Sequence, residues 1–134
     1  MIAPSNMNNR SLRGLIRSAA SEIIQDQLGF WKFKFADRLV FVITDANHNR
    51  MRIMSPISEF DGLQDQELQI LLAANFDRAL DARYCMNDDL IWSAFLHPLE
   101  ELSEGQFLDA LNQVVTLAKN FGTTYTSSDL IFGG

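Results

Sequence analysis

The chain has 134 residues, of which 47% are hydrophobic, and carries a formal net charge of -6 at pH 7. This length fits one domain with a single core, and the hydrophobic fraction argues against disorder. The acidic balance, with a sequence pI near 4.7, disfavours a nucleic-acid partner, because phosphate binding needs a surplus of Lys and Arg on one face.

Residues 1–10 are polar, rich in Met and without a pattern, which is typical of a flexible tail. A helix is expected from Ser11, a good N-cap residue, to the stop that Gly29 supplies. Its apolar residues recur at helical spacing: Leu12, Leu15, Ile16, Ala19, Ala20, Ile23 and Ile24. This stripe needs a sheet or another helix against it, since an isolated helix of this length is marginal in water.

A period of two begins after this helix. Trp31, Phe33 and Phe35 alternate with lysines, as in a strand with one buried and one solvated face. The next run, residues 39–43, is apolar on both faces and should lie inside the sheet. Residues 50–56 return as a third strand after a polar turn and end at a proline. The pattern predicts a three-stranded antiparallel meander.

A second helix and a hairpin are expected next. The helix covers residues 63–76, and its core-facing residues are Leu68, Leu71, Leu72 and Phe76. Two β-prone runs, residues 82–86 and 90–96, then flank a polar turn at Asn87-Asp88-Asp89.

The start of the last helix is marked by two signals. Ser103 and Gln106 form a Ser-x-x-Gln capping box, and Leu102 and Phe107 are spaced for a hydrophobic staple. Apolar residues then continue at helical spacing to Gly122. The resulting order, α-β-β-β-α-β-β-α, predicts an α+β domain with an antiparallel sheet and helices packed on one side.

The sequence offers no evident catalytic, cofactor or metal site. Cys85 occupies a strand position without a neighbouring His, which favours a small buried hydrophobe over a nucleophile. His48 and His97 are too far apart in sequence for a metal-ligand spacing. Asp88 and Asp89 fit turn chemistry better than an acid and base pair. We therefore expect a protein that is not an enzyme and holds neither metal nor cofactor.

The sequence shows features expected of a cytoplasmic protein and none expected of a membrane or secreted one. No apolar run approaches the roughly 20 residues of a membrane helix, and anionic lipid repels an acidic surface. The N-terminus lacks the basic start and apolar centre of a signal peptide. One cysteine cannot form an internal disulfide, as expected in a reducing compartment. The expected location is the cytoplasm.

A family likeness is carried mostly by the second half of the chain. Its residues are Leu71-Leu72-Ala73-Ala74-Asn75-Phe76, Ala82-Arg83-Tyr84, residues 90–99 and the final helix through Phe121-Gly122. Together with the element order over residues 11–122, they resemble the type III secretion chaperone-like fold, and more closely its YbjN branch, once labelled sensory transduction regulators. The resemblance implies that residues 11–134 form one domain of this kind, a dimer that binds polypeptide segments without enzymatic activity.

The run 90–96 is apolar on both alternating faces. Leu90, Trp92, Ala94 and Leu96 face one way, and Ile91 and Phe95 face the other. We expect the chain's helices to cover one face and a second copy to cover the other, because monomers seldom leave so much apolar area in water. The expected dimer interface is drawn from Ile91, Trp92, Ala94 and Phe95. Either Trp92 anchors it, or Trp92 points inward and Ile91 with Phe95 face the partner.

The aromatic strand also has two interpretations. Trp31, Phe33 and Phe35 either belong to the core or form the floor of an open peptide groove beside the first helix. The function that the family resemblance implies is a polypeptide-binding, chaperone-like adaptor acting as a homodimer. The alternatives are a regulatory or structural homodimer without a client and a small hydrolase whose residues are assembled in space.

Overall fold

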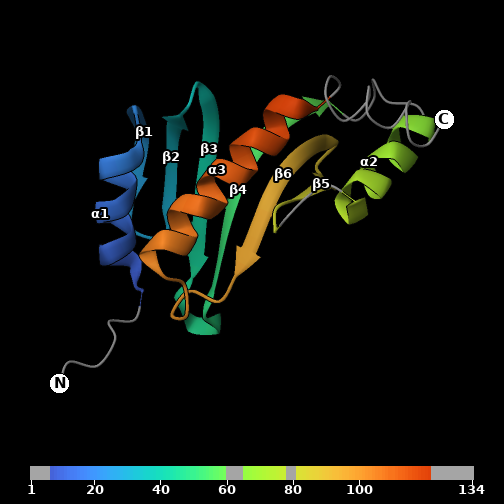
Figure 1. The fold of residues 1–134 in the computed structure, drawn as a ribbon. Coiled ribbons are helices and arrows are strands. Elements are labelled where there is room, and N and C mark those ends of the chain that lie inside the picture. Colours follow the sequence, from blue (N-terminus) through green and yellow to red (C-terminus); the bar gives the residue numbers. More distant parts are fainter. Residues whose placement is uncertain (1–6, 60–64, 78–80, 122–134) are drawn as a thin grey trace.

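The computed structural model describes residues 7–59, 65–77 and 81–121. Its elements follow in the order α1 (Asn9–Ala19), β1 (Glu22–Gln27), β2 (Phe30–Phe35), β3 (Arg38–Asp45), the 3-10 helix η1 (Ala46–His48), β4 (Arg50–Glu59), α2 (Asp65–Asp77), β5 (Arg83–Asn87), β6 (Leu90–His97) and α3 (Glu104–Asn120). The strands form one antiparallel sheet in the order β1-β2-β3-β4-β6-β5. α1 and α3 lie across one side of this sheet, and α2 lies beside β5 at its end (Figure 1). The α+β class with an antiparallel sheet and helices on one side is confirmed.

The structure adds one strand to the expected order. The helix that was expected to continue to Gly29 ends at Ala19, and residues 22–27 form the edge strand β1 instead. The β-branched residue Ile23 pairs with Phe33 of β2, and Asp26 pairs with Trp31. Ile23 therefore reaches the core from a strand, where its branched side chain fits well.

The first helix also begins earlier than expected. Asn8 is its N-cap, and its side chain accepts a hydrogen bond from the Ser11 N–H at 2.9 Å. The Ser11 hydroxyl accepts one from the Asn8 N–H at 3.0 Å, so Ser11 is the returning partner of a capping box and not the cap. Met7 is 6% exposed and belongs to the core. Residues 7–10 of the expected tail are thus folded, and residues 1–6 lie outside the described part.

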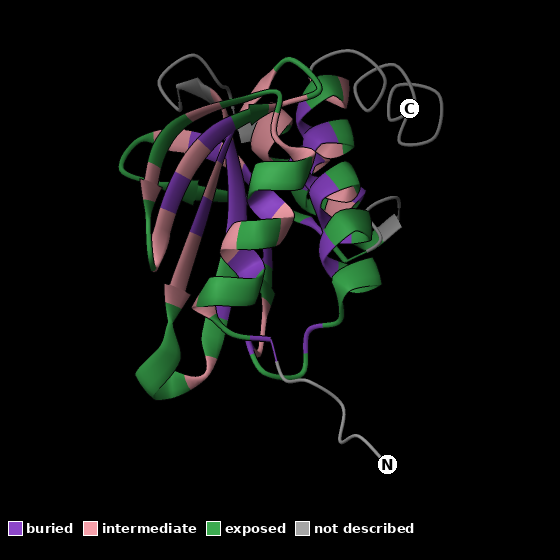
Figure 2. Ribbon diagram, turned by 90° about the vertical axis from the view of Figure 1, so that its left-hand side faces the viewer, coloured by how far each residue is buried: buried purple, intermediate pink, exposed green. Residues whose placement is uncertain are grey.

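The main core lies between the sheet and the helices α1 and α3. Its strands contribute Trp31, Phe33, Val40, Val42, Met51, Ile53 and Phe95, and its helices contribute Leu12, Ile16, Phe107, Leu111 and Val114. Figure 2 shows buried segments both on the strands and on the helices packed beside them. A second, smaller cluster joins α2 to the hairpin through Leu71, Ala74, Tyr84 and Ile91.

Tight turns connect the hairpins. Asp88 and Asp89 both have positive φ, 51° and 62°, between β5 and β6. Ala36 and Asp37, between β2 and β3, also have positive φ, 51° and 66°. Two successive positive φ values are typical of the two-residue turns whose twist matches antiparallel strands. The expected turn around Asp88 is therefore confirmed.

The capping box of the last helix is confirmed as well. The Gln106 N–H donates to Ser103 Oγ at 3.0 Å, and the Ser103 N–H donates to Gln106 Oε1 at 2.8 Å. Leu102 and Phe107 are both buried, as a hydrophobic staple requires.

Ser103→Ala is expected to lower the free energy of unfolding by about 0.5–2 kcal/mol, because one N–H of the first turn loses its acceptor. Urea unfolding followed by circular dichroism measures this loss. Ser103→Asp should retain most of the stability, since a carboxylate caps the helix and suits its dipole. Coincident unfolding curves for wild type and the Ala variant would contradict the role of the cap.

Candidate functional site

The side of the sheet without helices, here called the open face, carries its own aromatic cluster. Phe41 of β3 makes edge-to-face contacts with Phe30 at 6.1 Å and with Trp92 at 5.8 Å between ring centroids. The Lys32 Nζ lies 5.6 Å from the centre of the Phe41 ring. Met54 and Ala94 are buried on this side although they belong to neither core cluster. The open face is thus a surface of half-buried rings flanked by a cation.

The structure divides the expected interface residues between the two sides of the sheet. Ile91 and Phe95 point toward the helices and are 2% and 6% exposed. Trp92 lies on the open face, and its Nε1 donates to the Asn87 carbonyl at 3.2 Å. Ala94 shares that side but is buried. Of these four residues, only Trp92 presents substantial surface to a partner.

The residues expected for a peptide groove lie mainly in the interior. Trp31 and Phe33 are 0% exposed and pack in the main core with residues of α1 and α3. Phe35 is half-buried at the margin of the same cluster. Trp31 and Phe33 therefore take the core alternative and do not line a surface groove.

The edge strand β1 is the exposed part of this region. It is the terminal strand of the sheet, so one row of its backbone groups points away from β2. A register shift between Ile23 and Gln25 marks an irregularity at Ile24. Ile24 is 46% exposed, and Leu28 in the following turn is 44% exposed. An unpaired edge with apolar side chains on it is a template for another strand.

Asp26 fastens β1 to α1 and to the core. Its carboxylate accepts hydrogen bonds from Arg17 Nε at 2.8 Å, Arg13 Nε at 3.2 Å and Trp31 Nε1 at 3.1 Å. The hydrogen bond from Arg17 is the main cause that lowers the pKa of Asp26 below its ordinary 3.8, while desolvation opposes it. The charged carboxylate thus holds the edge strand against the first helix.

Asp26→Asn should lower the urea midpoint and reduce the loss of stability in acid. The pKa of Asp26 is lowered in the folded state, so its contribution is present above the ordinary pKa of 3.8 and is lost as the pH falls through the folded value. The amide can still accept from Trp31, so the change isolates the charge interaction with Arg13 and Arg17. Urea unfolding of wild type and variant at neutral and acidic pH measures the difference. Equal differences at both pH values would argue against this role.

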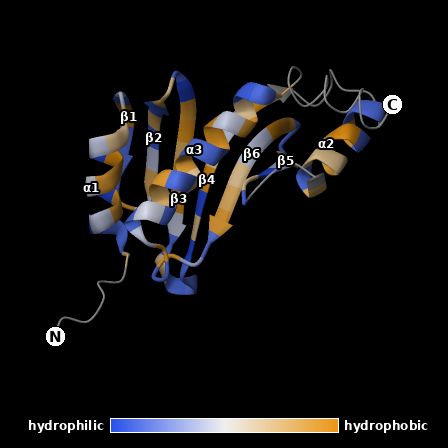
Figure 3. Ribbon diagram, in the orientation of Figure 1, coloured by the Kyte–Doolittle hydropathy of each residue, from blue (hydrophilic) through white to orange (hydrophobic). Residues whose placement is uncertain are grey.

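A second apolar surface, here called the α2–β5 surface, consists of Leu72, Phe76 and Met86. These side chains are 70%, 90% and 55% exposed, and Figure 3 shows hydrophobic residues along α2. Leu72 and Met86 also border a cavity of about 230 Å³, whose lining includes Leu68, Leu71, Tyr84 and Ile91. Of the four residues of α2 expected to face the core, Leu71 is buried and Leu68 packs partly buried against it, whereas Leu72 and Phe76 face solvent.

α2 also covers part of the outer edge of β5. The Tyr84 N–H donates to Asn75 Oδ1 at 2.7 Å, and the Tyr84 carbonyl accepts from Asn75 Nδ2 at 3.0 Å. The Asn75 amide thereby makes both bonds that an adjacent strand would make at that residue.

Cys85 is exposed, so the expectation of a buried Cys85 is wrong. It pairs with Trp92 across the hairpin and also borders the same apolar cavity. Partial desolvation by neighbouring atoms raises the pKa of its thiol above the ordinary 9.0, and the positive charge of Arg52 opposes this shift. The thiol therefore stays protonated at neutral pH, which makes it a poor nucleophile.

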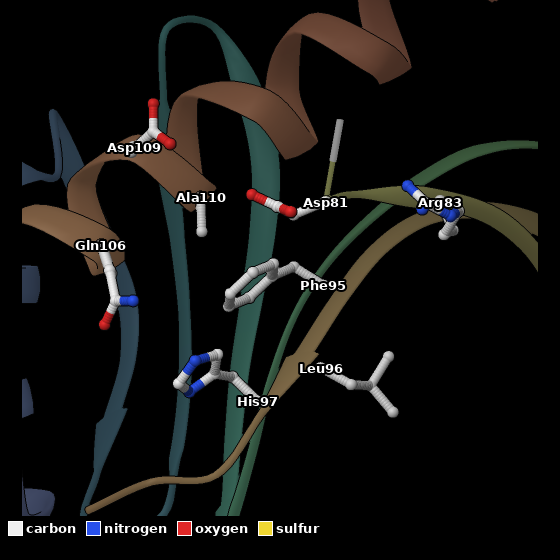
Figure 4. Close-up of a pocket in the computed structure, with 8 residues that line it drawn as sticks. All are labelled: Asp81, Arg83, Phe95, Leu96, His97, Gln106, Asp109 and Ala110. Carbon is white, nitrogen blue, oxygen red and sulfur yellow. The ribbon is translucent and has the colours of Figure 1, made fainter. Parts of the chain in front are cut away.

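A polar cavity of about 300 Å³ lies between β6 and α3, where Asp81, His97, Gln106 and Asp109 surround it (Figure 4). The two carboxylates are engaged, because Gln113 Nε2 donates to Asp81 at 3.2 Å and to Asp109 at 2.9 Å.

His97 does not complete a catalytic arrangement in this cavity. Its Nδ1 donates to the Pro98 carbonyl at 2.8 Å, and its ring stacks on Phe95. The described residues that line the cavity include no Ser, Thr or Cys. Nothing here pairs a base with a nucleophile, so the hydrolase alternative gains no support.

Residues 7–59, 65–77 and 81–121 contain no group of three or more His, Cys, Asp or Glu that could hold a metal ion. No helix in the described part of the chain is long and apolar enough to span a membrane.

No protein-family model and no curated protein matches the sequence. Solved structures do match. A chain of the HopA1–SchA chaperone–effector complex has a TM-score of 0.62 at 13% identity, covering 82% of this chain and 88% of its own. A chain of the Yersinia pestis type III secretion chaperone SycH in complex with a fragment of YscM2 also has 0.62, at 18% identity, covering 85% and 98%. YbjN from E. coli has 0.56 at 13% identity, covering 82% and 85%.

The chain has the type III secretion chaperone-like fold. Its neighbours have chaperone and regulator folds, and identities this low establish the fold alone. The likeness expected from residues 71–76 and 90–99 is confirmed at the level of the fold. The partners of individual chaperone-like proteins do not transfer with it.

Proposed function

We propose that the protein is a non-enzymatic adaptor that binds an extended polypeptide segment and acts as a cytoplasmic homodimer. The observation that carries the proposal is the exposed edge strand β1 with Ile24 and Leu28 beside it, in a fold that chaperones of effector proteins share. Strand addition at such an edge needs no catalytic residues, since main-chain hydrogen bonds supply affinity and apolar side chains supply selectivity.

The client would pair with β1 on its outer side. α1 is anchored beside this strand by Arg13 and Arg17, which bind Asp26, so the edge is held in place before a client arrives. A preorganised edge reduces the entropy lost on binding. Ile24 and Leu28 would each cover an apolar residue of the added strand.

The homodimer is proposed to form through the α2–β5 surface. Leu72, Phe76 and Met86 place apolar side chains on neighbouring elements, as a self-complementary contact requires. The open face, which the sequence favoured, suits this role less well. A two-fold contact there would place the side that carries Lys32 and Arg52 against a second copy of the same basic side, which costs electrostatic energy.

Affinity capture from a native lysate, followed by mass spectrometry, tests client binding. Wild type is expected to retain polypeptides that Ile24→Asp/Leu28→Asp does not, because the charges oppose an apolar strand at the edge. Leu108→Asp is the matched control, since Leu108 is 38% exposed on α3, away from β1. Capture of the same polypeptides by all three proteins would refute the role of β1. No polypeptide above background with wild type would favour the homodimer without a client.

A further inference from the structure

The open face concentrates positive charge in an acidic protein. Strand alternation places five cations on it: Lys32, Lys34, Arg50, Arg52 and Arg83. Among side chains that the structure describes, the carboxylates at open-face positions are Glu22 and Asp45, and both have partners. Glu22 lies 4.0 Å from Lys34, and Asp45 lies 2.8 Å from the His48 Nδ1. The face is therefore basic while the chain as a whole carries -6.

Apolar side chains lie among these cations on the open face. Phe41 and Trp92 form the centre of the aromatic cluster, and Leu96 is 63% exposed at its margin. Arg52 lies opposite Leu96 in the pairing of β4 with β6. Aromatic residues and Arg are enriched among the interface residues that contribute most to the free energy of binding.

We propose that the open face binds an acidic polypeptide segment that carries aromatic or aliphatic side chains. The proposal rests on the proposed function and names the chemistry of the client. Carboxylates of the segment would pair with Lys32 and Arg52, and an apolar side chain would cover Trp92. A second copy of this face is excluded as occupant by its like charges, and charge complementarity selects an anionic partner.

The surface favours a polypeptide over a nucleic acid. Phe41 and Trp92 meet edge to face at 70° and are half-buried, so they do not form a set of flat rings for successive bases. The negative charge of the rest of the protein also repels a long polyanion, whereas a short acidic segment need only meet the basic face.

The test uses fluorescein-labelled synthetic peptides of equal length and fluorescence anisotropy. One peptide alternates Glu and Asp with Leu and Phe, a second replaces each acid with Lys, and a third replaces each apolar residue with Ser. The wild-type protein is expected to bind the first peptide best, more weakly as salt rises. Lys32→Glu/Arg52→Glu should weaken this binding about tenfold and improve binding of the basic peptide. Arg10→Glu, a charge reversal on α1, should leave it unchanged.

Trp92 supplies a local readout with the unlabelled acidic peptide. Its tryptophan emission should change on binding, and this change should disappear in Trp92→Phe, since the other tryptophan, Trp31, is buried in the core. Four results would each overturn the proposal. The acidic peptide could fail to bind wild type, or bind the charge-reversed variant with wild-type affinity. The emission change could persist without Trp92, or a single-stranded RNA oligonucleotide could bind more tightly than the peptide. The same lysate capture separates the two proposals. If Ile24→Asp/Leu28→Asp lost the client but Lys32→Glu/Arg52→Glu captured it like wild type, the proposed function would stand and only this inference would fall.

Discussion

Phe95→Asp is expected to abolish cooperative folding, whereas Trp92→Asp should yield a folded protein. The two residues are three positions apart on β6 but lie on opposite sides of the sheet. Phe95 is 6% exposed and belongs to the main core, opposite Ile53 of β4. Removing a buried Phe side chain alone costs about 3–5 kcal/mol, and an unpaired buried charge adds to that. A domain of this size has only about 5–15 kcal/mol in total.

Trp92 provides the matched comparison because it lies on a side of the sheet that none of the described helices covers. Circular dichroism and urea unfolding should show a cooperative transition for Trp92→Asp and none for Phe95→Asp. Sedimentation should find Trp92→Asp still dimeric. A monomeric Trp92→Asp would instead assign the interface to the open face, and a folded Phe95→Asp would contradict the assignment of the core.

Leu72→Asp/Phe76→Asp should convert the proposed dimer into folded monomers. Both side chains are largely exposed in one protomer, so the change costs little within the chain. In the dimer they would be central apolar contacts, and truncating such a residue costs about 2 kcal/mol or more. Two charges at the contact should therefore weaken association at least about a thousandfold.

Sedimentation equilibrium over a wide concentration range measures this change, and circular dichroism confirms the fold. Leu108→Asp is again the control, because it adds a carboxylate to an exposed apolar site outside the α2–β5 surface. Wild type that sediments as a monomer, or a double variant that associates like wild type, would contradict the proposed interface.

Local signals account for what the sequence predicted well. The Ser103 and Gln106 capping box and the turn at Asp88 and Asp89 depend on residues within a few positions of one another. Strand β1 was missed because Ile23 and Ile24 continue the helical spacing of Leu12 and Ile16. Its strand conformation depends instead on pairing with β2 and on the contact between Asp26 and Trp31, which are tertiary interactions.

The candidate site was less accessible to sequence reasoning. Both faces of β6 are apolar, so the alternation could not decide whether Trp92 or Phe95 points outward. Packing of α3 against the sheet decides it.

The spacing of Arg50 and Arg52 predicts that they share one strand face, where they could meet an acidic partner or protect an edge. The full extent of the basic face does not follow from the sequence, because Lys32, Arg52 and Arg83 come from strands that are distant in the chain. Their alternation was visible, but their common side required the sheet order.

The bonds between Asn75 and Tyr84 have a consequence for polymerisation. A sheet with two open edges can add molecules at both ends and grow into a fibril. Here the Asn75 amide occupies the outward N–H and C=O of Tyr84, the second residue of β5, while the opposite edge at β1 remains available in the described part of the chain. Strand addition is therefore directed to one end, and a strand added at β1 does not create a growing chain of identical molecules.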